Sequence, residues 1–435
     1  MSTLNVYFRD MPCAQLTESA NGQLQFSYLD SWTEEGDFPV CTRLPFGPEP
    51  SDHETVAPFV ASFLPEGENL RNRLEKLLHV DAAHDFGLLA AIGRESAGAL
   101  SFWPEGEEKK EAPGYDPLKD KDFNAWKEYA HDLPLQFPGH AIRLSLAGAQ
   151  SKTALYFDDE DAPWLPERGA PTTHIIKPRI PGCQPSSTFV EWVTMRIARA
   201  VLGDDQVPQS DLWRNCYRVR RFDRPRAGAA IHRLHQEDFC LALGRMPAQK
   251  YESGNGDENA LSQCFELIDR LGENGRIRSP VIQRLRLLDQ VILNVLLHNP
   301  DAHLKNYAFL YGEDGTLEVS PLYDCLCTYG MKFAAENAGA WAQGAGPAVH
   351  TTRLSLRIGN ATHIDQVGLA DWELFADECG FTQSFVRRRV RIQAYSVDRS
   401  MKVVLGSITE HAPQAEYVAD LIQTAVTLQL RNVSG

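Results

Sequence analysis

The chain has 435 residues, of which 43% are hydrophobic and 23% are charged, so it can bury a large core and form two or three domains. Its formal net charge of −15 argues against a protein that binds nucleic acid unaided, because phosphate contacts require a basic surface. No apolar stretch approaches the roughly 20 residues of a membrane-spanning helix and no basic-then-apolar segment opens the chain, so we expect a cytoplasmic protein without a membrane partner.

The first 110 residues are predicted to form a small unit of strands and helices. Alternating apolar residues at 4–8 and 24–28 predict strands, and the amphipathic stretch 69–78 predicts a helix. Residues 104–121 are rich in Glu, Lys, Pro, Gly and Asp without apolar periodicity, so we interpret them as a surface linker. We therefore expect three parts, at 1–110, 111–225 and 226–435.

A small-residue loop, Ser145-Leu-Ala-Gly-Ala-Gln-Ser-Lys152, precedes a predicted strand at 153–157. Gly148 between two alanines would let backbone N–H groups approach a phosphate, and Lys152 adds positive charge. The loop matches neither G-x-G-x-x-G nor a Walker motif, and turns of this composition are more often structural.

Three further features would fit a nucleotide site. Lys177 lies on a predicted strand and Glu191 on a predicted helix at 189–197, and such a pair can hold an ammonium group against phosphates, as in kinases. An unrelated exposed lysine and glutamate would give the same pattern. Residues 217–224 alternate like a strand and enter a turn, where backbone groups around Arg221 and Phe222 are available to an adenine edge, although Phe222 is also typical of a core residue.

A helix is predicted after Ser279, with Pro280 at its first position. It must end at Asn299, because Pro300 disfavours the helical conformation of the residue before it. Its predicted apolar face consists of Val281, Leu285, Leu288, Ile292, Val295 and Leu296.

The loop that follows this helix, Asn299-Pro-Asp-Ala-His-Leu-Lys-Asn306, is the most informative segment. Asp301 and Asn306 have the spacing of a kinase catalytic loop, in which the Asp accepts the proton of the attacking hydroxyl and the Asn holds Mg²⁺. A hairpin predicted at 307–323 then delivers Asp324 as the main magnesium ligand. The three side chains are expected to meet at one site.

With these motifs the chain resembles the HipA-like serine/threonine kinases, the toxin components of bacterial HipBA toxin–antitoxin modules. Six motifs that carry the resemblance occur in chain order, at Ser145–Ala154, His174–Lys177, Arg221–Arg224, Gln236–Asp238, Asp301–Asn306 and Tyr323-Asp324. The resemblance implies an α+β, two-lobed protein-kinase-like fold with a small N-terminal α/β subdomain and a mainly helical C-terminal lobe.

The resemblance also implies ATP and Mg²⁺ as cofactors. Asp301, Lys177 and Glu191 would be catalytic, and Asn306 and Asp324 would bind the metal. The expected nucleotide-binding residues are Ala147, Gly148, Ala149, Gln150, Ser151, Lys152, Lys177, Arg220, Arg221, Phe222, Asp223, His303, Lys305 and Asn306.

By the same resemblance, Ser145 would be autophosphorylated, with Ser151 as a second candidate. A phosphate there would repel ATP and switch the enzyme off. The substrate would be a translation protein such as an aminoacyl-tRNA synthetase, and the partner a HipB-like helix-turn-helix antitoxin bound to operator DNA.

Several alternatives stay open on the sequence. The basic run Arg387, Arg388, Arg389 and Arg391 is either a solvated helix face or a contact to DNA or a partner. A Gly/Ala-rich segment at 330–348 occupies the place of an activation loop, with no role that the sequence reveals. The chain is alternatively a metal-dependent hydrolase using His298, Asp301 and His303, a catalytically weak co-repressor, or a small-molecule kinase of similar fold.

Overall fold

Segments distant in the sequence come together in two units. The computed structural model describes residues 1–35, 38–107, 109, 114–130, 137, 151–167, 169–228, 230–252, 259–332, 352–408 and 414–434. Unit 1 contains Met1–Pro178, Arg218–Ala248 and Phe309–Glu318, and unit 2 contains Arg179–Tyr217, Gln249–Ala308 and Val319–Gly435. The three-part division of the sequence stays a prediction.

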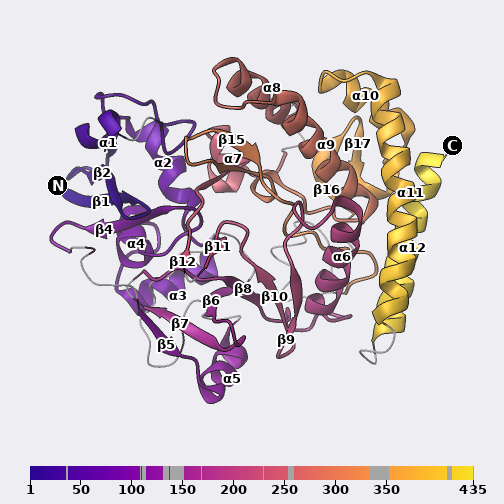
Figure 1. Cartoon of the computed structure of the whole chain (residues 1–435), viewed down its shortest axis with the longest axis horizontal. Helices are drawn as coiled ribbons and strands as arrows, with labels where there is room; N and C mark the ends of the chain where they lie inside the picture. The colour runs from indigo at the N-terminus through magenta and orange to yellow at the C-terminus, as the bar shows by residue number, and fades with distance from the viewer. Residues whose placement is uncertain are drawn as a thin grey trace. The chain divides into compact units, whose positions relative to one another are not determined.

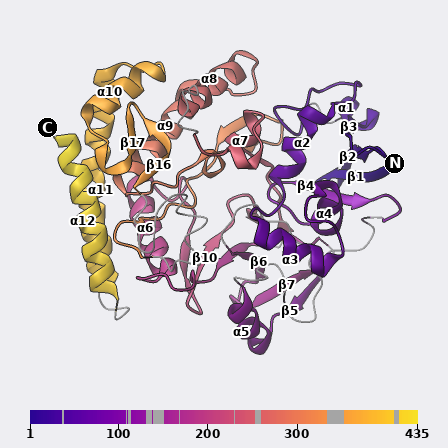
Figure 2. The ribbon, with the colours of Figure 1, turned by 180° about the vertical axis from the view of Figure 1, so that it is seen from behind.

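Unit 1 begins with an antiparallel sheet of order β3-β2-β1-β4. Its strands are β1 (Ser2–Phe8), β2 (Met11–Glu18), β3 (Leu24–Tyr28) and β4 (Leu100–Pro104), and its helices are α1 (Asp30–Glu35), α2 (His53–Ser62), α3 (Glu68–Leu78) and α4 (Asp85–Ile92). Helix α2 contacts β3, and α4 contacts β4 (Figure 2). Between them Phe26, Phe59 and Phe102 pack edge to face, the arrangement that aromatic quadrupoles favour. The predicted strands at 4–8 and 24–28 and the helix at 69–78 are confirmed.

A second antiparallel run of strands in unit 1 has the order β5-β7-β6-β8. These strands are β5 (Gly114–Pro117), β6 (Thr153–Phe157), β7 (Pro163–Glu167) and β8 (His174–Lys177), and α5 (Asp120–Tyr129) follows β5. The linker prediction for 104–121 is therefore partly wrong. The ring of Tyr115 stacks on Tyr156 at 4.2 Å between centroids, and its hydroxyl donates to the Pro171 carbonyl at 2.8 Å, so long-range contacts order this stretch.

The rest of unit 1 is formed by short elements. They are β10 (Cys216–Arg220), which enters the unit at Arg218, β11 (Arg226–Ala227), β12 (Ala230–Ile231), β13 (Gln236–Asp238), α7 (Phe239–Ala242), η1 (Pro247–Gln249), β14 (Ala308–Tyr311) and β15 (Leu317–Val319). Strand β14 lies between β13 and β15 in one sheet, so the predicted hairpin is confirmed, but its second strand ends at Val319 and not at residue 323.

Unit 2 is mainly helical. Its helices are α6 (Ser187–Leu202), α8 (Ala260–Glu273), α9 (Pro280–Leu296), α10 (Leu369–Glu378), α11 (Gln383–Ile408) and α12 (Ala415–Ser434), and its short elements are β9 (Ser210–Trp213), η2 (Leu304–Asn306), β16 (Arg353–Ile358), β17 (Ala361–His363) and η3 (Ile364–Gln366). Helices α11 and α12 lie side by side (Figure 1), and α9 contacts α8, α11 and α12. Within the described residues, no helix combines the length and apolarity needed to cross a bilayer.

Helix α9 matches its prediction in most details. Pro280 is its first residue and Ser279 holds the N-cap position, but the Ser279 side chain makes no capping hydrogen bond. Leu288, Ile292, Val295 and Leu296 are buried as expected, whereas Val281 is 70% exposed and does not belong to the core. The helix ends at Leu296, three residues before the predicted stop.

Candidate active site

The polypeptide between α9 and η2 is held in place by side-chain amides. The Asn299 Nδ2 donates to the Asn294 Oδ1 on α9 at 2.7 Å, and to the Asp324 carbonyl at 3.4 Å. His298, just before it, adopts a positive φ of 57°, which turns the chain out of the helix. These bonds tie the loop that carries Asp301 to the residue that follows the hairpin.

Asn306 and Asp324 lie together in unit 2. The Asn306 Nδ2 is 3.3 Å from the Asp324 Oδ2, and the Asn306 Oδ1 accepts the His303 N–H at 3.0 Å. The Tyr323 hydroxyl donates to the Lys305 carbonyl at 2.6 Å, which fixes Asp324 beside the loop. Asp324 itself has a positive φ of 59°. A carboxylate and an amide oxygen are the hard donors that Mg²⁺ prefers, so the residues present fit this ion.

Asp301 is half-buried next to this pair. Burial raises the pKa of Asp301 to about 7; Lys250 and hydrogen bonds from Ser355 and Tyr251 act in the opposite direction, and the Asp324 carboxylate adds to the rise. The Ser355 hydroxyl is 3.4 Å from the Asp301 Oδ1. A carboxyl group with a pKa near neutrality suits a general base, because it can both accept and release a proton at physiological pH.

The surroundings of His303 disfavour protonation of its imidazole. Burial, together with the Lys250 and Lys305 ammonium groups, holds the pKa of His303 well below its usual range, although Asp324 opposes them. Its Nδ1 is buried and has no hydrogen-bond partner among the described residues. An unpaired buried nitrogen is costly, so it is a candidate to meet a bound molecule.

Glu191 also belongs to this region of unit 2. It is 2% exposed on α6. Burial raises the pKa of Tyr217 well above its usual range, and the Glu191 and Asp324 carboxylates both add to the effect. Glu191 and Asp324 therefore lie close enough to act on the same phenol.

Comparison with known proteins agrees with these motifs. Residues 144–401 match the HipA-like C-terminal domain family, and residues 4–103 match the HipA N-terminal domain family. The chain belongs to the HipA-like kinase family. The Sinorhizobium fredii protein Y4mE is 36% identical over 400 residues, which are 89% of this chain and 88% of Y4mE. The serine/threonine-protein kinase toxin HipA of Shewanella oneidensis is 29% identical over 333 residues, 74% of each chain.

A solved structure of a relative has the same fold as this chain. Shewanella oneidensis HipA, determined in a complex with HipB and operator DNA, matches 99% of this chain with a TM-score of 0.77 and 23% identity, and 96% of that HipA is covered. The α+β kinase-like fold expected from the sequence is confirmed.

The expected nucleotide-binding residues are only partly described. Ser145, Ala147, Gly148, Ala149 and Gln150 lie outside the described residues, as does most of the segment 330–348. Ser151 and Lys152 are half-buried just before β6. Lys177, 5% exposed, ends β8 in unit 1, whereas Glu191 belongs to unit 2, so their ion pair stays a prediction.

The expected hinge turns out to be the centre of a buried ion cluster in unit 1. The Arg221 Nε and Nη2 donate to the two Asp223 oxygens at 2.9 and 2.7 Å, and the Arg221 Nη1 lies 3.1 Å from the Glu95 Oε1. Arg224 and Arg233 also pair with Glu95. The side chains of Arg221 and Asp223 are thus committed to protein partners, and the Arg221 N–H donates to the Thr173 carbonyl at 2.9 Å. Neighbouring Arg220 is exposed and Phe222 half-buried. Contact between an adenine edge and the other backbone groups around Arg221 and Phe222 stays a prediction.

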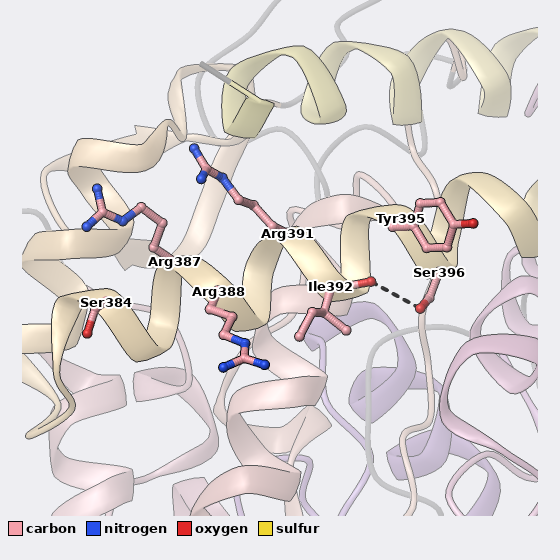
Figure 3. Close-up of a pocket in the computed structure, with 7 residues that line it drawn as sticks. All are labelled: Ser384, Arg387, Arg388, Arg391, Ile392, Tyr395 and Ser396. Carbon is pink, nitrogen blue, oxygen red and sulfur yellow. Dashed lines mark hydrogen bonds between the residues drawn. The ribbon is translucent and has the colours of Figure 1, made fainter.

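Three arginines of the basic run on α11, Arg387, Arg388 and Arg391, are shown in Figure 3. Arg389, which was expected in this run, is paired with α9, because its Nε donates to the Asp289 Oδ1 at 2.6 Å. The side chains of Arg387 and Arg391 point to one side of α11, and that of Arg388 points to another. A shallow hollow is lined by Ser384, Arg387, Arg388, Arg391, Ile392, Tyr395 and Ser396. Arg387 pairs with Glu373 at 3.1 Å. Arg389 and Arg387 are therefore already paired within the protein, whereas Arg388 is exposed.

The hydrolase alternative finds no support in the described part of the chain. There, no group of three or more His, Cys, Asp or Glu side chains is arranged to hold a metal ion. A kinase-type magnesium site needs fewer acidic side chains, because Asn306 and the substrate phosphates would complete the coordination of the ion.

Three residues near Asp301 were missed by sequence reasoning: Lys250, Tyr251 and Ser355. Lys250-Tyr251 is followed by a Gly-, Asn- and Asp-rich stretch, which is typical of a loop. A lysine at the edge of such a loop gives no sequence signal for a partner about fifty residues away.

Proposed function

We propose that the protein is an ATP-dependent serine/threonine protein kinase. The observation that carries the proposal is the convergence of Asp301, Asn306 and Asp324 in unit 2. Membership of the HipA-like kinase family supports it, as does the kinase toxin named among the relatives.

The proposed step is an in-line transfer. The acceptor hydroxyl oxygen forms a bond to the γ-phosphorus of ATP while the bond from that phosphorus to the β–γ bridging oxygen breaks, and ADP leaves. Asp301 accepts the hydroxyl proton, and general base catalysis of this kind contributes roughly 10²–10⁴-fold. Asn306 and Asp324 would hold Mg²⁺, which supplies neutralising charge to the phosphates when bound.

Lys177 on β8 and Glu191 on α6 are given roles by analogy with other kinases. Lys177 would secure the nucleotide phosphates, and Glu191 would position it. Ser151, Lys152, His303 and Lys305 would contribute nucleotide contacts; for His303 the buried Nδ1 described above supports this role.

Regulation and target are proposed from family membership. Autophosphorylation at Ser145 would add negative charge to a loop that approaches ATP phosphates and so inactivate the kinase. The substrate would be a translation protein such as an aminoacyl-tRNA synthetase.

The proposed partner is a HipB-like antitoxin that carries the chain to operator DNA. The Shewanella oneidensis relative was solved with HipB and operator DNA, and this chain is too acidic to bind DNA by itself. Arg388 and Arg391 on α11 are the proposed phosphate contacts. Replacing either with alanine should reduce the salt dependence of DNA binding by the complex by about one ion. An unchanged salt slope would show that α11 does not meet DNA.

The decisive experiment is incorporation of label from [γ-³²P]ATP into protein, with the chain alone and with a bacterial extract. Asp301→Asn should lower labelling by roughly 10²-fold or more while binding of a fluorescent ATP analogue is retained. Asp398→Asn, on the exposed ion pair with Lys402, is the matched control and should label normally. A co-repressor would label nothing, a small-molecule kinase would consume ATP without labelling polypeptide, and a hydrolase would turn over without nucleotide.

A further inference from the structure

The segment 249–252 of unit 2 runs along the loop that carries Asp301. The Lys250 carbonyl accepts the Leu304 N–H at 3.2 Å. The Glu252 N–H donates to the Ser355 carbonyl at 2.9 Å, and the Ser355 N–H donates to the Pro300 carbonyl at 2.8 Å. Three stretches distant in the sequence are therefore joined by backbone hydrogen bonds around Asp301.

The Lys250 ammonium is enclosed at this junction. Lys250 is 6% exposed, and its Nζ lies 5.2 Å from the centre of the Tyr251 ring. Lysine is rarely buried unless a negative charge compensates it, because the interior solvates an ammonium poorly.

The adjacent carboxylate of Glu252 is committed elsewhere. It accepts the Arg357 N–H at 2.7 Å and lies 3.4 Å from the Arg357 Nε. The Lys250 ammonium acts electrostatically on Asp301, and Lys250 and Asp324 both act on His303. The buried positive charge thus faces the group of side chains assigned to phosphoryl transfer.

Tyr251 extends the same contact. Its side chain hydrogen bonds to Asp301, and its ring meets the His303 ring edge-on at 5.3 Å and 75°. Tyr251 and the Ser355 hydroxyl, 3.4 Å from the Asp301 Oδ1, are placed to orient this carboxylate toward an incoming hydroxyl.

We propose that Lys250 is a further catalytic residue, whose ammonium neutralises charge on the γ-phosphoryl group during transfer, and that Tyr251 is a positioning residue for Asp301. This inference rests on the proposed kinase function. While the acceptor oxygen bonds to phosphorus and the bridging oxygen departs with ADP, negative charge spreads over the phosphoryl oxygens. Asp301 and Asp324 repel that charge, and a preorganised cation beside them offsets the repulsion without reorganisation of water.

The test is the rate of self-labelling from [γ-³²P]ATP in the full chain, measured against ATP concentration. Lys250→Met should lower the rate at saturating ATP by roughly 10²-fold, the loss typical of removing one preorganised charge-stabilising group, and should change the KM for ATP by less than about threefold. Lys250→Arg should recover at least about a tenth of the wild-type rate, because it keeps the charge. Tyr251→Phe should lower the rate about tenfold at an unchanged KM, because it affects the orientation of the base and not nucleotide binding.

Controls separate the possible failures. Lys402→Met, which removes an exposed ammonium paired with Asp398 at 2.6 Å, should match the wild type. Melting temperature and equilibrium binding of a fluorescent ATP analogue show whether each variant is folded and binds nucleotide, and Lys250→Gln serves as the second neutral variant if Lys250→Met does not fold.

An inactive wild type would refute the kinase function itself. An active wild type with Lys250→Met or Lys250→Gln within about threefold of it would overturn the role of Lys250 alone. If Lys250→Arg binds nucleotide but is as inactive as the neutral variants, the claim that Lys250 acts through its positive charge is overturned.

Discussion

Glu95→Gln tests whether the buried ion cluster stabilises unit 1. Glu95 is 1% exposed and faces three guanidinium groups, from Arg221 at 3.1 Å, Arg224 at 3.2 Å and Arg233. Asp223 is the other carboxylate of the cluster. The substitution keeps the side-chain shape but leaves three buried cations facing a single anion. It also turns an amide N–H₂ group toward guanidinium donors that need an acceptor.

The expected cost is large because the charges cannot be resolvated by water. Removing one partner of a buried ionic network costs about 3–5 kcal/mol, since the remaining charges lose their compensation. At about 2–4 °C per kcal/mol for a unit of this size, the unfolding transition should fall by roughly 10 °C.

Thermal and urea unfolding of the full chain measure this effect. The matched control is Asp161→Asn, which breaks the 2.6 Å pair with Arg218 but removes a carboxylate that is 61% exposed, so it should cost less than about 1 kcal/mol. If Glu95→Gln costs no more than Asp161→Asn, the cluster does not stabilise unit 1 and the reasoning from burial is wrong.

Two further predictions concern pH and magnesium. Burial alone would raise the pKa of Asp223, but Arg221, Arg224 and the Gly98 N–H outweigh it and hold that pKa well below its usual range; the pKa of Glu95 is lowered by its arginines in the same way. A carboxyl group with a depressed pKa in the folded state stabilises the protein above its unfolded pKa of about 4, and this stabilisation is lost as the pH falls. The free energy of unfolding should therefore drop more steeply below about pH 4 in the wild type than in Asp223→Asn. Parallel curves for the two proteins would contradict this. Asp324→Asn should raise the Mg²⁺ concentration needed for half-maximal labelling by roughly tenfold or more, and an unchanged requirement would remove Asp324 from the metal site.

The sequence determined the local structure around the site. Proline at the first position of α9, its apolar repeat and the proline after Asn299 act within a few residues, so the helix and the loop were predictable. The hairpin that precedes Asp324 is equally local. The spacing of Asp301 and Asn306 is likewise a short-range property. Together with five other short motifs it predicted the family, and the family model confirms that membership.

Only the tertiary structure decided which distant charges meet. Nothing in the sequence pairs Lys250 with Asp301, Glu95 with the arginines of the expected hinge, or Arg389 with Asp289. A charged residue has the same local pattern whether it faces water or a buried partner, because the partner is chosen by packing between elements far apart in the chain. For the same reason Val281 fitted the apolar repeat of α9 and yet lies in solvent: periodicity defines a helix face, while neighbouring helices determine how far along the helix that face is covered.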